Sequence, residues 1–361
     1  MMARPLHLGF LYAPEAGHQT HDESFDPLNP LHLTALAQGL ESGGFTFLLV
    51  DDSVGRTEPA RSEAFTTASF LATRTRHIGL IAAANTSYVE PYNVTRLAAS
   101  LDHVTHGRAG WLVSTGAVDP AGANYGQGAA APEAHYGRAD EILGIARRLW
   151  DSWEDDAFIR DKQSGVFVDG TRIHPIEHVG PAFSVKGPLN VARPPQGQVI
   201  LAHRVVDKPS ADFAGRHADV AILGAETAGS IVTLRDIVLG AARAARREQR
   251  EVRLFAEIVP FVGREPGAGA SKAPVANYVT GSPTEIVDQI EALANAVALD
   301  GVVLAPRVLR SGLDVFSREV VPELVRRQRL VAGTGAATLR ERLGLSRPRN
   351  IFEQPARRPA A

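Results

Sequence analysis

Short runs of apolar residues alternate along the chain with longer segments whose apolar residues recur at helical spacing. The apolar runs lie at 6–12, 45–51, 77–85, 109–114, 198–203, 219–224, 252–261 and 301–306. The helical segments lie at 31–44, 62–74, 91–103, 139–153, 209–217, 229–248, 283–297 and 313–328. The runs are continuously apolar rather than alternating, which is typical of parallel strands covered on both faces. The pattern therefore predicts eight strands alternating with eight helices.

The number of repeats distinguishes two α/β architectures. A count of eight favours a closed (β/α)8 TIM barrel over an open, doubly wound sheet. An open sheet that binds a dinucleotide would need a glycine-rich turn after its first strand, but the turn here, YAPEAGH (12–18), contains one glycine. We therefore predict an α/β fold of the TIM-barrel type.

One segment does not fit the strand–helix repeat. Residues 154–197 contain short β-like pieces separated by Gly and Asp turns, which predicts a hairpin-containing insertion after the fourth helix. Residues 1–345 are expected to form one barrel domain that includes this insertion. The Pro- and Arg-rich residues 346–361 are expected to form an extended tail, which could lie on a partner chain.

Composition excludes several classes of function. The 38 basic and 40 acidic residues give a formal net charge of −2, which offers no general attraction to nucleic acid or to anionic membranes. The chain has no cysteine, so disulfides, thiol nucleophiles and cysteine-ligated metals are excluded. No apolar run approaches the length of a membrane span, and the N-terminal stretch is interpreted as a first strand rather than a signal peptide. We expect a cytoplasmic protein.

Familiar catalytic motifs are missing from the sequence. It contains neither a G-x-S-x-G elbow nor an H-E-x-x-H zinc motif, and we expect no metal site. The C-terminal ends of barrel strands carry the active site in this architecture. The polar residues expected there are Asp51, Asp52, Asn85, Thr86, Ser87, Tyr88, Ser114, Thr115, His203 and Arg204. Hydroxyls and amides predominate, which suits a cofactor that brings its own reactivity.

The stretch NTSYVEPYNVTRLAASLDHVTHGRAGWLVST (85–115) resembles the flavin-dependent monooxygenases of the bacterial luciferase superfamily. The resemblance is to the nitrilotriacetate, dibenzothiophene-sulfone and pristinamycin-synthase monooxygenase branch in particular. Further similar segments follow in order at 147–157, 173–190, 214–222, 281–290, 320–327 and 338–345. Within the first stretch, Asp102, His103 and Arg108 match a structural joint of the family, so we interpret them as structural rather than catalytic.

The resemblance implies a (β/α)8 barrel that binds FMN and oxidises a small organic substrate with reduced flavin and O2. A separate flavin reductase usually supplies the reduced flavin, and such barrels commonly form homodimers. The alanine-rich helices at 62–74 and 91–101 are candidates for the dimer interface.

The resemblance also places three residues near the flavin: Asp52 beside the ring, Thr86 at a hydroxyl position and Tyr136 toward the phosphate. Each has a structural interpretation as well, respectively a helix cap, a turn hydroxyl and a packing residue. The residues expected to line the substrate pocket are His18, His21 and Tyr88.

The loop after the fifth strand departs from the family pattern. In place of Q-A-G-x-S-x-x-G, whose serine and glycine hold the flavin phosphate, this chain has HRVVDKPS, which begins at His203. Val205 stands at the glycine position and Asp207 at the serine position, so a bulky side chain and a repulsive carboxylate face the phosphate. His203 and Arg204 are expected to contact the cofactor, and Arg204 or Lys208 could offset the charge.

Two further departures bear on the cofactor. Pro132 replaces the family's histidine four residues before the tyrosine, and the long segment after the seventh strand is shortened to the loop 262–281. We expect weak FMN binding. Two alternatives stay open: a barrel that has lost catalysis and serves as a non-catalytic partner, and an oxidoreductase that uses a deazaflavin.

Overall fold

The computed structural model describes residues 4–13, 25–51, 60–116, 120–126, 132–225, 227–263, 277–305, 309–331 and 338–353. Eight parallel strands in this part of the chain form a closed barrel, which confirms the predicted TIM-barrel fold. They are β1 (His7–Tyr12), β2 (Phe47–Val50), β3 (Gly79–Asn85), β4 (Ala109–Ser114), β7 (Ile200–Val205), β8 (Val220–Leu223), β9 (Arg253–Val262) and β11 (Gly301–Leu304). Each pairs with the next, and β11 pairs with β1 to close the barrel.

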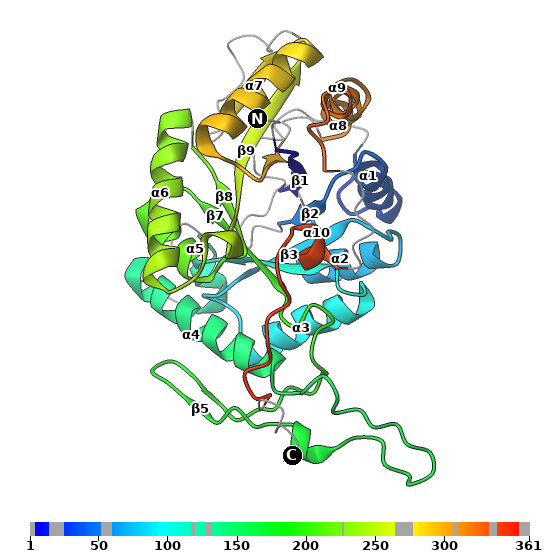
Figure 1. The fold of residues 1–361 in the computed structure, drawn as a ribbon, viewed down its shortest axis with the longest axis vertical. Coiled ribbons are helices and arrows are strands. Elements are labelled where there is room, and N and C mark those ends of the chain that lie inside the picture. Colours follow the sequence, from blue (N-terminus) through cyan, green and yellow to red (C-terminus); the bar gives the residue numbers. More distant parts are fainter. Residues whose placement is uncertain are drawn as a thin grey trace, which may run out of the picture.

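Helices cover the outside of the barrel (Figure 1). They are α1 (Pro30–Ser42), α2 (Ala64–Ala72), α3 (Pro91–Val104), α4 (Pro132–Trp150), α5 (Lys208–His217), α6 (Ala228–Ala244), α7 (Pro283–Val297) and α8 (Leu309–Val315). The predicted last helix, 313–328, is divided: α8 continues into a π-helical turn, η5 (Phe316–Val320), and then into α9 (Val321–Arg326). Among the described residues, no helix is long and apolar enough to cross a membrane.

The barrel interior is filled by large side chains that face glycines. Phe47 and Phe255 pack edge to face with ring centroids 5.1 Å apart. A Cβ added at Gly9 would lie 2.3 Å from the Phe47 ring, and one at Gly301 would lie 2.5 Å from Phe255. Glycine is therefore required at these two strand positions, since any side chain there would displace the aromatic core.

One strand was not predicted. Part of the expected loop 262–281 forms β10 (Asn277–Gly281), which pairs in parallel with the last five residues of β9, from Ile258 to Val262. The ten-residue β9 is longer than its barrel neighbours and extends beyond them, so its end offers unpaired backbone groups. A short strand beside a Gly- and Ala-rich segment has too weak a pattern to be recognised in advance.

The insertion after α4 contains the predicted hairpin, formed by the antiparallel strands β5 (His178–Val179) and β6 (Ser184–Val185). A short 3-10 turn, η3 (Gly170–Arg172), lies in the same insertion, and the whole segment extends beyond α3 and α4 (Figure 1). Two other such turns are η2 (Pro120–Tyr125) and η4 (Gln249–Glu251).

The described part of the C-terminal tail contacts its own chain at Asn350 and Phe352. Asn350 is buried and its Nδ2 donates to the backbone oxygens of Asp151 (2.9 Å) and Trp153 (2.8 Å). Phe352 stacks on His174 of the insertion. Before the tail, the short helix α10 (Leu339–Arg342) is also docked on the barrel, because the Leu339 amide donates to the Gly107 oxygen.

In the joint between α3 and β4, Asp102, His103 and Arg108 each bond to a different set of partners. Asp102 is fully buried and accepts hydrogen bonds from the Ala109 amide and from both the amide and the side chain of Gln196. His103 bonds to the Ala192 oxygen instead. Burial raises the pKa of Asp102 to about 6, and the hydrogen bonds offset only part of that effect. Arg108 donates to the backbone oxygens of neighbouring segments.

Candidate functional site

Two opposite charges face each other inside the barrel near its mouth. Arg204 on β7 donates from Nε and Nη2 to the two carboxylate oxygens of Glu257 on β9, with both distances 3.0 Å. The Glu257 side chain is 4% exposed and that of Arg204 is 35% exposed. The pair spans β8, which lies between the two strands. It gives the mouth a polar floor with no net charge.

His203 lies on the opposite face of β7 from Arg204. Its ring contacts Tyr136 of α4 and Phe213 of α5, so it is buried between the barrel and the helices rather than in the mouth. Nδ1 bonds to the Val113 oxygen at 2.7 Å, and burial lowers the pKa of His203 to about 4. His203 and Arg204 were both expected to contact the cofactor. Their side chains lie on opposite faces of β7, because successive side chains of a strand point to opposite faces.

The β7–α5 turn is closed by its own side chains. Asp207 is the N-cap of α5 and accepts from the Ser210 amide at 2.9 Å. Ser210 Oγ accepts from the amides of Val206 and Asp207, both at 3.0 Å. Val205, the last residue of β7, is fully buried. Asp207 places a carboxylate at the helix start, as the sequence indicated.

The residues after β3 form a rigid turn beside β4. Thr86 is fully buried, and its Oγ1 donates to the Ser114 oxygen at 3.0 Å. Ser87 Oγ accepts from the Gly116 amide at 2.8 Å and bonds to His135 Nδ1 at 2.9 Å. The Thr86 hydroxyl thus holds the two strand ends together, which is the turn role left open by the sequence.

Two tyrosines stack at the edge of the mouth. Tyr88, expected in the substrate pocket, lies against Tyr125 of η2 with centroids 4.4 Å apart and an interplanar angle of 12°. Tyr125 is 47% exposed. Asp52, His18 and His21, the other residues expected near the flavin or the substrate, lie outside the described residues.

Three residues of this region were missed by sequence reasoning. Glu257 had a usable signal, since it is the one carboxylate within the apolar run 252–261 and a buried charge needs a partner. His135 and Tyr125 carried no such signal, because their roles depend on the turn after β3, which lies far from them in the sequence.

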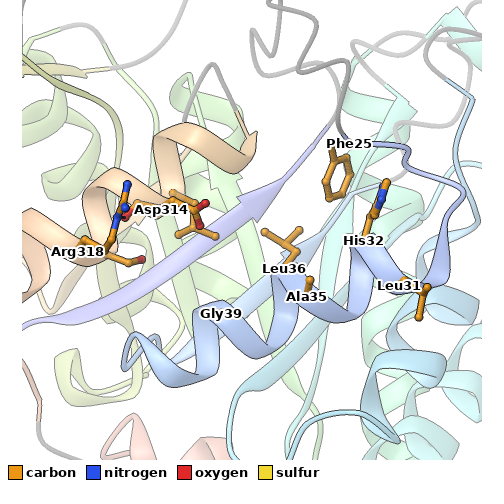
Figure 2. A pocket seen from close by; sticks show the side chains of 10 residues that line it. Phe25, Leu31, His32, Ala35, Leu36, Gly39, Asp314 and Arg318 are labelled. Carbon is orange, nitrogen blue, oxygen red and sulfur yellow. Dashed lines mark hydrogen bonds between the residues drawn. The ribbon is translucent and has the colours of Figure 1, made fainter.

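A groove of about 600 Å³ lies elsewhere, between α1 and the α8–η5 segment on the outer helical layer. Figure 2 shows Phe25 and His32 toward one end, Asp314 and Arg318 toward the other, and Leu36 between them. This groove is separate from the Arg204–Glu257 floor of the mouth.

No group of three or more His, Asp or Glu side chains within the described ranges could hold a metal ion. His174 and His178 bond to different carboxylates, those of Glu154 (2.7 Å) and Glu141 (3.0 Å).

Comparison with known proteins decides the family. Residues 6–279 match the pattern of the luciferase-like monooxygenase family. The chain belongs to this family. It is 31% identical to nitrilotriacetate monooxygenase component A of Aminobacter aminovorans, with 84% of each chain covered. It is 41% identical to a chain of pristinamycin IIA synthase from Streptomyces pristinaespiralis, over 47% of this chain and 56% of that one. The solved long-chain alkane monooxygenase shares the fold, with a TM-score of 0.87 and 24% identity over 95% of this chain and 96% of that one.

The luciferase-like chain is accordingly an enzyme, a flavin-dependent monooxygenase. Near the mouth of its barrel, Arg204 and Glu257 form a polar ion pair that carries no net charge. The β7–α5 turn does not fit a phosphate, because the amides of Val206, Asp207 and Ser210 are already bonded within the turn and a carboxylate lies at the helix start.

Proposed function

We propose that the protein oxidises a small organic molecule with O2 and reduced FMN, that a separate reductase supplies the flavin, and that FMN is held weakly. The observation that supports this most directly is the mouth of the closed barrel, where Arg204 and Glu257 form a neutral polar floor. Nitrilotriacetate monooxygenase component A is by its name one part of a larger system, which supports a separate reductase.

The chain's own residues would bind and shield rather than transfer protons. A bound reduced flavin would supply the electrons that activate O2. Thr86 and Ser114 fix the relative positions of the β3 and β4 ends, and His203 is held neutral in the layer behind them. Asp52 is proposed to lie beside the flavin ring, and Tyr136 toward the phosphate end of the flavin.

The substrate side of the mouth is proposed to include Tyr88, together with His18 and His21. The stacked Tyr88–Tyr125 pair supports this placement, because it offers an apolar, planar surface at the entrance. A small organic molecule with an apolar part would be accepted there.

The test is turnover with FMN, a flavin reductase, NADH, 18O2 and a panel of small organic substrates. Incorporation of one 18O atom into a product is the expected result, and Asp52→Ala should lose most of it. Asp314→Ala, in the groove outside the barrel, is the matched control and should keep full activity. Normal turnover by Asp52→Ala would remove that residue from the proposed site.

A second candidate is a barrel that serves as a partner chain without catalysis, and the closed β7–α5 turn favours it. Two different chains of pristinamycin IIA synthase are similar to this one, at 41% and 33% identity, each over 47% of this chain. Related chains thus occur together in one named enzyme, which gives the second candidate a precedent. The absorption spectrum after incubation with flavins distinguishes the cases. A bound flavin band supports the enzyme, a deazaflavin band supports the deazaflavin alternative, and no bound chromophore supports the non-catalytic partner.

A further inference from the structure

The start of α5 carries Asp207, which stands at the serine position of the family pattern that the sequence resembles. The positive end of a helix attracts anions through its free amides. Here the Asp207 carboxylate accepts from the Ser210 amide, and Ser210 Oγ accepts from the amides of Val206 and Asp207. The helix end is therefore occupied by an anion that belongs to the chain.

The hydroxyl groups nearby are also bonded within the chain. Tyr136 makes side-chain hydrogen bonds with Thr115 and Ser210, and its pKa is raised by burial and by the charge of Asp207. Asp207 therefore lies close enough to Tyr136 to act on it electrostatically. A phosphate placed beside Tyr136 would meet the same negative charge.

The two basic residues of the turn do not face this point. Arg204 lies on the inner face of β7, bound to Glu257. Lys208 is paired with Asp212, one turn along α5. Each of the two cations that could offset Asp207 is therefore paired with another carboxylate.

We propose that this flavin site gains no affinity from a phosphate, so that riboflavin binds at least as tightly as FMN. The proposal rests on the proposed function, since it concerns the same flavin site. FMN differs from riboflavin only by a phosphate, which carries a charge of about −1.5 to −2 at pH 7. Two like charges 4 Å apart repel by an amount that corresponds to about fivefold in affinity in water and about a thousandfold at intermediate dielectric. Asp207 is exposed, so the expected effect is toward the fivefold end.

The experiment is a titration of flavin-free protein with oxidised riboflavin and with FMN, followed by quenching of flavin fluorescence at low and high salt. The variant Asp207→Asn removes the charge and keeps a good N-cap, so α5 should remain intact. We expect FMN to bind the variant at least fivefold more tightly than it binds the natural protein, with riboflavin changed less than twofold. Asp236→Asn, an exposed change of the same charge on α6, is the matched control and should alter neither affinity.

The natural protein tests the proposal even without the variant. Its affinity for FMN should rise with salt, because salt screens repulsion between like charges. An FMN affinity more than tenfold above that for riboflavin would overturn the inference while leaving the proposed function standing. Failure of both flavins to bind at 100-fold the protein concentration would overturn the inference and the proposed function together.

Discussion

Asp102 gives a prediction about the pH dependence of stability, because burial raises its pKa more than its hydrogen bonds lower it. Its carboxyl is fully buried, with Gln196 and Ala109 as hydrogen-bond partners, and burial raises its pKa from the ordinary 3.8 to about 6. Between these two values the folded chain keeps a proton that the unfolded chain has lost. The free energy of unfolding therefore falls as the pH rises from about 4 to about 6, and the loss is complete above that range.

The magnitude follows from the two pKa values. At 1.36 kcal/mol per pH unit, the difference between 3.8 and about 6 corresponds to about 3 kcal/mol of stability lost by pH 7. Asp102→Asn has no proton to lose, so this component disappears. The new amide faces the Gln196 N–H with its own N–H group, which costs about 1 to 3 kcal/mol at every pH. The variant should therefore be clearly less stable at pH 4 and comparable to the natural protein at pH 7.

The assay is urea unfolding followed by tryptophan fluorescence, at pH values from 4 to 7.5, for the natural protein and for Asp102→Asn. The difference between their free energies of unfolding should shift by about 2.5 kcal/mol in favour of the variant across this range, since the unfolded carboxyl is already partly ionised at pH 4. Asp236→Asn, on the exposed surface of α6, controls for the loss of one charge. A shift below 1 kcal/mol would show that the three hydrogen bonds to Asp102 stabilise its ionised form as strongly as burial opposes it.

Two further predictions concern the floor of the mouth and association. Arg204→Ala would leave the buried Glu257 without its partner and should cost about 3 kcal/mol of stability at pH 7, the lower end of the usual range because Arg204 is one-third exposed. Adding Glu257→Gln should recover most of that loss in the same unfolding assay, and failure to recover it would contradict the ion-pair explanation. We also expect a homodimer through α2 and α3, which static light scattering at micromolar concentration would measure. A monomeric mass would refute it.

The barrel itself was predictable from the sequence. Parallel strands that are buried on both faces have continuously apolar sequences, and eight such runs alternate with helical segments along this chain. The predicted helix 283–297 coincides with α7, and the predicted 209–217 differs from α5 by one residue at its start. Such elements are encoded locally, by burial of the helix face and by the residues at the helix ends, so a single sequence suffices.

Elements stabilised mainly by distant contacts were not predictable. β10 exists because β9 extends beyond the barrel and offers it a pairing edge. The described tail is ordered by Asn350 and Phe352, whose partners lie about 180 to 200 residues away. The sequence of the tail itself is polar and rich in proline, and it resembles that of an unstructured arm.

The candidate site was likewise only partly predictable from the sequence. The sequence alone located the strand ends, the change at Asp207 and the likeness to a flavin enzyme. Only the tertiary structure decided that Arg204 faces the barrel interior while His203 faces the helices, and that Gln196, rather than His103, partners Asp102. The physical reason is that a residue's chemistry is fixed by its side chain, whereas its charge state and its partners depend on which face it occupies and on what distant segments pack against that face.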